Sequence, residues 1–331
     1  MAQSTAAIIG GDTLIGCELN ELLVESRLAG EIRMISTDPG AARLVVDPGE
    51  DEAAILAPLS PEALFGADAV FLAGASESSI QALEMTGAHG PALIDVTAAL
   101  EDSPRARLRA PMVEAAEDFP IDAIHVIAHP AAIALALFYS RIAPRNAISR
   151  AVVEIFEPVS ARGQRGITEL QKQAVSLLSF KPLPKQVFDA QLSFNMLSEY
   201  GAEAPEALSI FEQRIERHLA TLLLKTSVTP MPSLRLIQAP VFHGYSLSIW
   251  MEFEKNPGVE VLRHALTGDG VDVRGDDEEA PHNVGVAGQS GVTIGNVRAD
   301  RNNTRACWFW LVADNFRLQA ENAVAVAKEF L

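Results

Sequence analysis

The chain of 331 residues is long enough for two domains, and its 48% hydrophobic and 21% charged residues are typical of a globular protein. Its formal net charge of −17 disfavours nucleic acids and anionic membrane surfaces as partners, because both require a basic face. No apolar run approaches the roughly 20 residues that cross a bilayer, and the two cysteines form neither a disulfide framework nor a zinc motif, so we expect a cytoplasmic protein that binds no metal.

Short apolar runs alternate with helix-length segments over the first 130 residues. The run at residues 6–10 predicts a strand, and leucines at helical spacing predict a helix over residues 14–28. Such alternation is typical of βαβ units with right-handed crossovers. It predicts an α/β fold with a Rossmann-like, doubly wound parallel sheet. Further strands are expected at residues 32–36, 69–73, 92–96 and 123–128.

From about residue 150 the expected strands follow one another, with two long helices between them. This order predicts a mixed sheet in an α+β domain over residues 129–312. The expected strands are 151–156, 234–240, 245–254, 293–298 and 307–313, and the helices are 166–178 and 207–223. Three tryptophans of these strands, Trp250, Trp308 and Trp310, are candidate anchors of a homodimer interface.

Two further segments complete the chain. Residues 268–291 are rich in Gly and Asp and predict a mobile loop rather than a metal site, because the acidic residues lack a regular ligand spacing. Residues 317–331 predict an amphipathic helix that packs on the first domain. We therefore expect one domain over residues 1–128 and 313–331.

A glycine-containing loop joins the first strand to the first helix, the place where dinucleotides bind in this fold. Gly10 and Gly16 match the outer positions of a G-x-x-G-x-x-G pattern, but the middle position is Thr13, which would crowd a diphosphate, and Asp12 adds negative charge. A βα turn that binds no ligand explains this pattern equally well. If a dinucleotide binds, Asp38 after the second strand would accept the ribose hydroxyls, which favours NAD over NADP.

Three later segments carry a resemblance to a known family. They are residues 159–170 (Val-Ser-Ala-Arg-Gly-Gln-Arg-Gly-Ile-Thr-Glu-Leu), residues 238–248, which begin Gln-Ala-Pro-Val-Phe, and residues 312–317 (Val-Ala-Asp-Asn-Phe-Arg). In this order, the chain resembles the aspartate-semialdehyde dehydrogenase family over essentially its whole length, and more closely its Usg-type paralogues. The resemblance implies an NAD(P)-binding domain and a dimerisation domain. The dinucleotide contacts it implies are Gly10, Gly11, Thr13, Leu14, Ile15, Gly16, Asp38, Ala73, Gly74 and Asn315.

The same resemblance implies that the family's reacting groups are replaced. In the family, a Cys attacks the substrate, a His moves the proton, a Gln positions the intermediate and two Arg bind the substrate carboxylate and phosphate. The positions that match Cys, Gln, substrate Arg, His and phosphate Arg hold Ala132, Glu157, Gln238, Tyr245 and Glu101. The two carboxylates, Glu157 and Glu101, would repel an anionic substrate.

The sequence leaves several alternatives open. His129, which precedes the helix expected after the strand at residues 123–128, is either a surrogate base or a structural residue. Cys17 is either a buried apolar residue or a reactive thiol. We expect a homodimer without aspartate-semialdehyde dehydrogenase activity that binds an unidentified ligand or partner. The alternative is an NAD(P)-dependent oxidoreductase that acts on an aldehyde or oxo group of a different substrate and uses His129, Glu157 or Tyr245.

Overall fold

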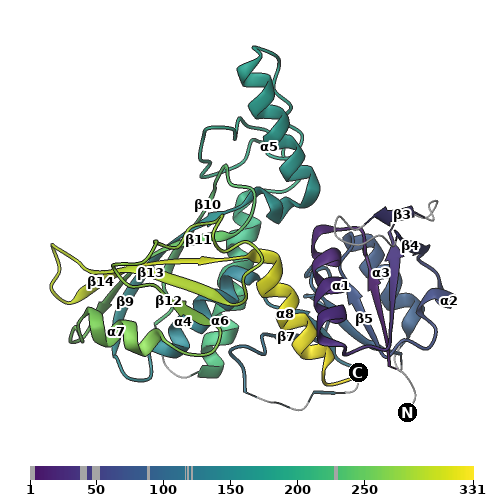
Figure 1. Ribbon diagram of the computed structural model, residues 1–331, viewed down its shortest axis with the longest axis horizontal. Helices are drawn as coiled ribbons and strands as arrows, with labels where there is room; N and C mark the ends of the chain where they lie inside the picture. Colours follow the sequence, from purple (N-terminus) through teal and green to yellow (C-terminus); the bar gives the residue numbers. More distant parts are fainter. Residues whose placement is uncertain are drawn as a thin grey trace. The chain divides into compact units, whose positions relative to one another are not determined.

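The computed structural model describes residues 4–37, 43–46, 53–87, 90–115, 117, 119–120, 122–226 and 230–331. The chain forms two compact units, coloured by sequence in Figure 1. Unit 1 comprises Met1–Ala128 and Gln319–Leu331, and unit 2 comprises His129–Leu318. The second boundary therefore follows residue 318 instead of residue 312, and it falls within the last helix, α8 (Asn315–Ala327).

Unit 1 is built on one eight-stranded sheet. Its strands are β1 (Thr5–Ile9), β2 (Glu31–Ser36), β3 (Arg43–Val46), β4 (Ala53–Pro58), β5 (Ala69–Leu72), β6 (Ala92–Asp95), β7 (Ala106–Arg109) and β8 (Ile124–Ile127). Their order is β3-β4-β2-β1-β5-β6-β8-β7. All neighbours pair in parallel except β3, which pairs antiparallel with β4. The predicted Rossmann-like parallel sheet is confirmed, with β3, β4 and β7 added to the strands expected from sequence.

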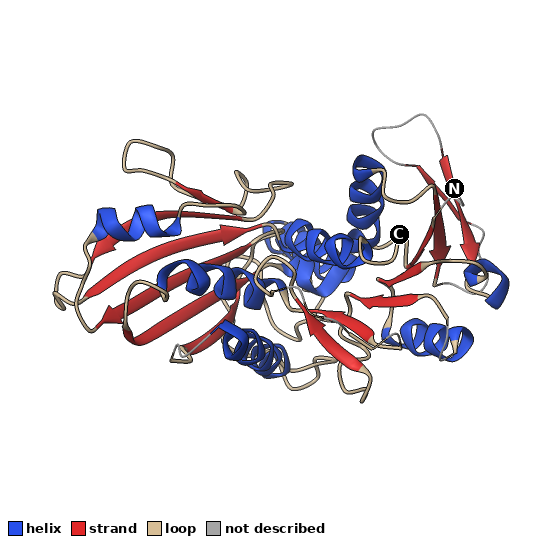
Figure 2. Cartoon of the chain, turned by 90° about the horizontal axis from the view of Figure 1, so that it is seen from below, coloured by secondary structure: helices blue, strands red, loops and turns tan. Residues whose placement is uncertain are grey.

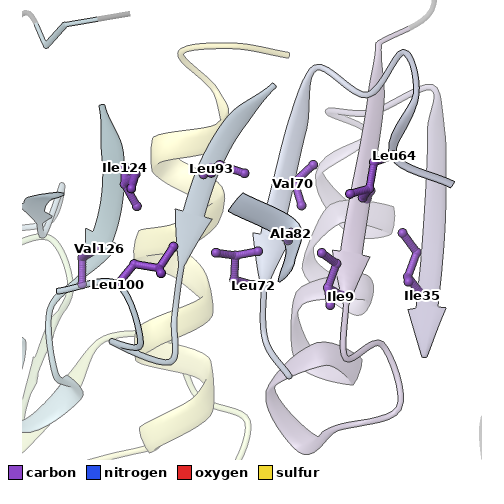
Figure 3. Packing of buried hydrophobic residues seen from close by; sticks show 11 residues of the cluster. Ile9, Ile35, Leu64, Val70, Leu72, Ala82, Leu93, Leu100, Ile124 and Val126 are labelled. Atoms are coloured by element: carbon purple, nitrogen blue, oxygen red, sulfur yellow. The ribbon is translucent and has the colours of Figure 1, made fainter. Parts of the chain in front are cut away.

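The helices of unit 1 are α1 (Leu14–Ser26), α2 (Pro61–Leu64), α3 (Ser76–Thr86) and the C-terminal part of α8. The core between sheet and helices is aliphatic. Ile9, Val70 and Leu72 of neighbouring strands pack with Leu64 of α2 and Ala82 of α3 (Figure 3). Strand β5 is buried along its whole length, as expected for a parallel strand that is covered on both faces.

Unit 2 contains a six-stranded mixed sheet, drawn in red with the other strands in Figure 2. Its strands are β9 (Ile148–Glu157), β10 (Ser233–Gln238), β11 (Tyr245–Phe253), β12 (Val271–Val273), β13 (Val292–Ala299) and β14 (Ala306–Ala313). Their order is β10-β9-β11-β14-β13-β12. The pairs β10–β9 and β12–β13 are parallel and the others are antiparallel, so the predicted mixed sheet is confirmed.

The helices of unit 2 are α4 (Pro130–Ile142), α5 (Gly163–Leu178), α6 (Leu208–Thr226) and α7 (Val259–Leu266), with a short 3-10 turn at Val159–Arg162. The sheet has one buried and one open face. On β9, Ala151 and Val153 are buried, whereas Val152 between them is 45% exposed. Trp308 of β14 is 43% exposed. The open face therefore carries partly exposed apolar side chains.

The sequence suggested a loop over the whole of residues 268–291, but part of this segment is a strand. It contains β12, which pairs with β13, because Val271 and Val273 supply an apolar alternation that the surrounding glycines obscure. Asn283 Nδ2 donates to the carbonyl oxygens of His243 (3.1 Å) and Gly244 (2.6 Å). The segment is therefore tied to the turn that precedes β11.

No helix within the described residues combines the length and the apolar character that a membrane span requires.

Candidate functional site

The glycine loop of unit 1 makes a tight turn between β1 and α1. Gly10 has a φ of 86°, and a Cβ atom there would lie 2.6 Å from the Cα of Gly74. A Cβ on Gly16 would collide with the carbonyl oxygen of Gly10. The N–H groups of Gly10 and Gly11 both donate to the carbonyl of Ile35, at 2.8 and 3.2 Å. Glycine is thus required at the two outer positions of the pattern by the turn itself.

The Thr13 hydroxyl is used within this turn. Thr13 is the N-cap of α1, and its Oγ1 accepts a hydrogen bond from the N–H of Gly16 at 3.0 Å. The same Oγ1 lies 2.8 Å from the carbonyl oxygen of Gly10 and 3.0 Å from that of Ala73. The residue that interrupts the glycine pattern therefore stabilises the start of the helix. Leu14 and Ile15 begin α1.

Two further positions of the nucleotide-binding prediction have different outcomes. Asp38 lies outside the described residues. Cys17, in the first turn of α1, is exposed, so the expectation of a buried apolar residue is wrong. Its place on the outer side of the helix follows from the helical phase, because Gly16 and Leu19 take the inner positions.

Glu101 lies on a loop whose shape is fixed by Asp95 at the end of β6. The buried Asp95 carboxylate accepts hydrogen bonds from Thr97 N (2.8 Å), Thr97 Oγ1 (2.6 Å) and Leu100 N (2.9 Å). Ala98 between them has a φ of 58°. Burial raises the pKa of Asp95, and these hydrogen bonds act against that rise. Glu101 itself is half-buried.

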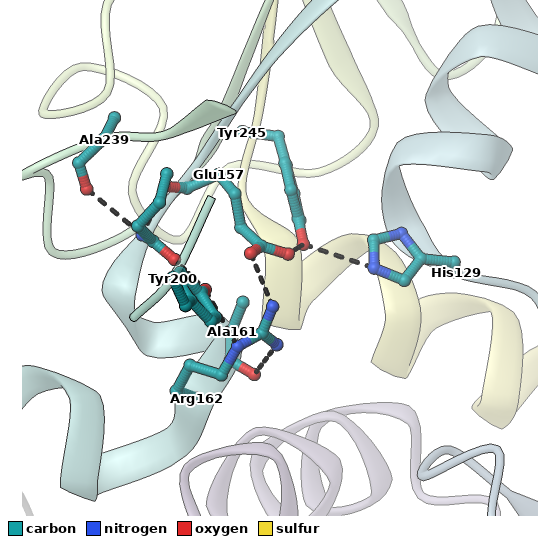
Figure 4. A network of polar contacts seen from close by, with 8 residues as sticks. His129, Glu157, Ala161, Arg162, Tyr200, Ala239 and Tyr245 are labelled. Atoms are coloured by element: carbon teal, nitrogen blue, oxygen red, sulfur yellow. Dashed lines mark hydrogen bonds and ion pairs between the residues drawn. The ribbon is translucent and has the colours of Figure 1, made fainter. Parts of the chain in front are cut away.

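In unit 2, four of the predicted positions meet in one polar network, shown in Figure 4. Glu157, the last residue of β9, is fully buried. Its Oε1 accepts a hydrogen bond from the Tyr245 hydroxyl at 3.0 Å. Its Oε2 forms an ion pair with Arg162 Nη2 at 2.6 Å. Arg162 therefore balances the negative charge of Glu157, and the expected repulsion of an anionic substrate by Glu157 stays a prediction.

His129 connects to this network through Tyr245. The backbone N–H of Ala131 donates to His129 Nδ1 at 3.2 Å, so Nδ1 carries no proton and the neutral ring holds its proton on Nε2. Nε2 lies 3.3 Å from the Tyr245 hydroxyl and donates to it. The backbone N–H of His129 donates to Nδ1 of His218 at 2.9 Å. The hydrogen bonds thus run in one direction, from His129 through Tyr245 to Glu157.

Gln238 and Tyr200 close the other side of the network. Gln238 Nε2 donates to the carbonyl oxygen of Glu157 at 2.8 Å, and its Oε1 accepts from the Tyr200 hydroxyl at 2.6 Å. Arg162 Nε donates to the same hydroxyl at 3.2 Å. The Arg162 guanidinium also lies over the ring of Phe211, 3.2 Å from its centre. The fully buried Gln238 side chain is therefore held by protein groups.

Burial determines the protonation of these groups. It lowers the pKa of His129 well below its usual value, and the nearby cations act in the same direction. It raises the pKa of Tyr245 well above its usual value, and the Glu157 carboxylate adds to this rise. Burial also raises the pKa of Glu157, against the opposing charge of Arg162. His129 is consequently neutral and Tyr245 protonated near pH 7.

Ala132, the residue that the resemblance predicts at the position of the family's nucleophile, is fully buried in the first turn of α4. The chain has two cysteines. Cys307 pairs with Met251 on the β11–β14 ladder, whereas Tyr245 pairs with Ala313 at its other end. The two positions are roughly 20 Å apart along the strand. Unit 2 therefore has no thiol beside Tyr245. Within the described ranges, no three His, Cys, Asp or Glu side chains are placed to hold a metal ion.

Asn315 helps to fix the turn before Tyr245. Its Oδ1 accepts from the N–H of Gly244 at 2.9 Å, and its Nδ2 donates to Ser160 Oγ at 3.2 Å. Gly244 has a φ of 83°. Its carbonyl is held by Asn283 from the other side, so the backbone that presents Tyr245 is restrained twice.

Sequence reasoning missed Arg162 and Tyr200 as members of the network. A signal for Arg162 was present, because a buried carboxylate at Glu157 requires a cation and Arg162 is close in sequence. Tyr200 follows a segment without regular structure, and nothing in the sequence connects it to Gln238. The two residues meet because Leu197 bridges to Gln238 at the edge of β10.

Comparisons with known proteins agree with this architecture. The family model described as "Semialdehyde dehydrogenase, dimerisation domain" matches residues 141–318. A USG-1 protein homologue of Pseudomonas aeruginosa is 34% identical over 173 residues, 51% of each chain. An aspartate-semialdehyde dehydrogenase of Aquifex aeolicus is 31% identical over 273 residues, 78% of each chain.

Solved structures agree as well. A probable aspartate-semialdehyde dehydrogenase from Pseudomonas aeruginosa has a TM-score of 0.84 and 25% identity, covering 99% of this chain and 98% of that one. The aspartate-semialdehyde dehydrogenase of Candida albicans, solved with NADP, covers 100% of both chains with a TM-score of 0.67; at 13% identity it supports the fold alone.

Proposed function

Since the chain belongs to the semialdehyde dehydrogenase family, we propose that it is a homodimeric member that lacks aspartate-semialdehyde dehydrogenase activity and acts by binding a ligand or a protein partner. In this proposal unit 1 is the nucleotide-binding domain and unit 2 the dimerisation domain. The observation that carries the proposal is the buried network of His129, Tyr245, Glu157 and Arg162.

The hydrogen bonds of this network are satisfied from within the protein. His129 uses one ring nitrogen for the N–H of Ala131 and the other for Tyr245. The Tyr245 hydroxyl donates a hydrogen bond to one carboxylate oxygen of Glu157, and the second oxygen is paired with Arg162. A general acid or base needs a proton or a lone pair directed at the substrate. Here those groups are directed at one another, and the nucleophile position is Ala132.

The proposal of a homodimer rests on the open face of the unit 2 sheet. Trp250 and Trp308 both donate their indole N–H groups to Asp300 Oδ2, at 2.7 and 3.0 Å. The side chains of Val152 and Trp308 are partly exposed. Aromatic side chains that are fixed in position make good interface anchors. The family model that matches this unit is named for dimerisation.

A retained NAD(P) site in unit 1 is supported by the geometry of the glycine loop. The helix start at Leu14 and Ile15 provides backbone N–H groups of the kind that bind diphosphates, and the turn at Gly10 places this helix start directly after β1. Because Thr13 is directed into the turn, it leaves the approach less crowded than its side chain alone would suggest. The preference for NAD over NADP, which depends on Asp38, stays a prediction.

One observation favours the alternative, an NAD(P)-dependent oxidoreductase for a different aldehyde or oxo substrate. Buried titratable groups with shifted pKa values cluster at catalytic sites, and His129, Tyr245 and Glu157 form such a cluster. In that case the substrate would have to displace one of the internal hydrogen bonds.

The test combines an activity assay with ligand binding. The chain is incubated with aspartate semialdehyde, phosphate and NADP, beside an active aspartate-semialdehyde dehydrogenase as positive control, and NADPH formation is followed. We expect no turnover above the protein-free rate. Thermal shifts with NAD, NADP and their reduced forms then report dinucleotide binding, since a ligand at 100 times its Kd stabilises by about 2.7 kcal/mol. Turnover comparable to the control would overturn the proposal, and an oxidoreductase requires a shift with a dinucleotide.

A further inference from the structure

A cavity of about 350 Å³ lies in unit 2 beside Tyr200. Residues between positions 198 and 209 form most of its wall, and Glu212 of α6 and Leu236 of β10 complete it. This volume lies at the lower end of the range for small-molecule sites and holds roughly a dozen water-sized groups. The cavity is separate from the four family positions discussed above.

The lining of the cavity is acidic and aromatic. Two acidic residues, Glu199 and Glu212, line it together with Ser198, Ser209 and the aromatic Tyr200. No Lys, Arg or His is among the lining residues. Carboxylates attract a cation, and the face of an aromatic ring binds an ammonium group through its quadrupole. An anionic ligand would meet two like charges.

Two features reduce the negative charge without cancelling it. The cavity includes the start of α6, whose dipole contributes roughly half a positive charge. The N–H of Leu236 donates to Glu212 Oε2 at 2.6 Å. Both act on Glu212, whereas Glu199 is exposed at the wall of the cavity. The net charge at the cavity is still negative, so it favours a cationic ligand.

Tyr200 belongs both to the cavity and to the buried network. Its ring lines the cavity and lies edge-on to Phe188, with 5.3 Å between ring centres. Its hydroxyl donates to Gln238 and accepts from Arg162, the partner of Glu157. A molecule that packs against this ring therefore contacts the side chain that holds the ion pair in place.

We propose that this cavity binds a small organic ammonium compound, with Glu199 and Glu212 balancing its charge and Tyr200 transmitting its presence to Arg162. The site is independent of dehydrogenase activity, so its failure would leave the proposed function unaffected.

Calorimetric titration of the full chain tests the binding. The probes are putrescine and choline, and the matched controls are 1,4-butanediol and succinate, which are neutral and anionic. We expect saturable binding of at least one amine. Glu199→Gln with Glu212→Gln should weaken it about tenfold, the loss expected for two partly exposed charge pairs. Because the amide introduced by Glu212→Gln still offers an oxygen to the N–H of Leu236, the double variant should fold. Glu216→Gln, an exposed change elsewhere on α6, should leave the affinity unchanged.

Three outcomes would overturn the proposed binding of an organic ammonium compound. They are no saturation by either amine up to about 10 mM, equal affinity in the double variant, or equal binding of succinate. The coupling is tested by the NMR signal of the Arg162 Nε–H, assigned with Arg162→Lys. At saturation this signal should shift in the wild type, because its acceptor is the Tyr200 hydroxyl. A signal that stays in place at saturation would overturn the coupling.

Discussion

Removal of Arg162 should destabilise unit 2 strongly, because it leaves the Glu157 carboxylate buried without its cation. The side chains of Glu157 and Arg162 are 0% and 10% exposed, and their charged atoms are 2.6 Å apart. Breaking such a buried pair from one side costs about 3–5 kcal/mol. For Arg162→Leu we therefore expect a loss of about 4 kcal/mol, most of which comes from the uncompensated carboxylate.

Urea unfolding followed by tryptophan fluorescence is the suitable assay. All three tryptophans, Trp250, Trp308 and Trp310, are in unit 2, so the signal reports this unit alone. With a slope of about 2 kcal/mol per molar urea, the midpoint should fall by about 2 M. Arg165→Leu, a change of an exposed arginine in the first turn of α5, should stay within about 0.5 kcal/mol of the wild type. Protein concentration is kept equal, since the proposed dimer would add to stability.

The pH dependence and a second substitution separate charge from packing. Burial already raises the pKa of the Glu157 carboxyl, and without Arg162 this pKa rises further above its unfolded value. The protonated folded form is then favoured, so the stability lost at pH 7 should partly return as the pH falls towards the unfolded pKa of about 4.3. Glu157→Gln in the Arg162→Leu background should restore most of the midpoint at pH 7. A midpoint for Arg162→Leu equal to that of Arg165→Leu would refute the argument.

Three further predictions concern other parts of the chain. Ala132→Cys alone should give no NADPH from aspartate semialdehyde, because members of a catalytic set act together; turnover is expected, if at all, only with Glu101→Arg, Glu157→Gln, Gln238→Arg and Tyr245→His added. Burial, followed by the charge of Arg109, lowers the pKa of His125 to about 4. Below pH 6.5 protonation of this residue therefore favours the unfolded state, and the free energy of unfolding of unit 1 should fall by about 3 kcal/mol between pH 6.5 and pH 4. Hydrogen exchange of β8 measures this loss, and His125→Gln should remove it. Trp308→Glu should shift the mass by light scattering from dimer to monomer at micromolar concentration; an unchanged dimer would exclude this face as the interface.

Much of the fold could be predicted because periodicity acts locally. The alternation in β11 predicted residues 245–254, and the strand runs from Tyr245 to Phe253. Strand β7 was missed because two of its four residues, Arg107 and Arg109, are charged. Arg109 is nevertheless buried, since it forms ion pairs with Glu114 and with Glu329, both at 2.6 Å. The pairing with Glu329, near the other end of the chain, carries no local sequence signal.

The connections within the network of unit 2 could not be predicted from the sequence. The resemblance to a family identified Ala132, Glu157, Gln238 and Tyr245, and unit 2 brings the last three together with His129. The nearness of Arg162 in the sequence suggests a cation for a buried Glu157, but the pairing itself depends on the 3-10 turn that directs Arg162 back towards the end of β9.

The replaced residues are best understood as a set. A carboxylate at position 157 would be costly in a buried site, yet it is matched by a cation, and Tyr245 supplies a hydroxyl proton to its other oxygen. Gln238 at the family's arginine position avoids a second buried cation beside Arg162 and instead binds two backbone carbonyls and Tyr200. Glu157, Gln238 and Tyr245 thus each form a hydrogen bond or ion pair with a neighbour in the network. Restoring one family residue would therefore leave a buried partner unsatisfied at a cost of about 1–3 kcal/mol, and this is why a single reversion should lower stability before it restores any chemistry.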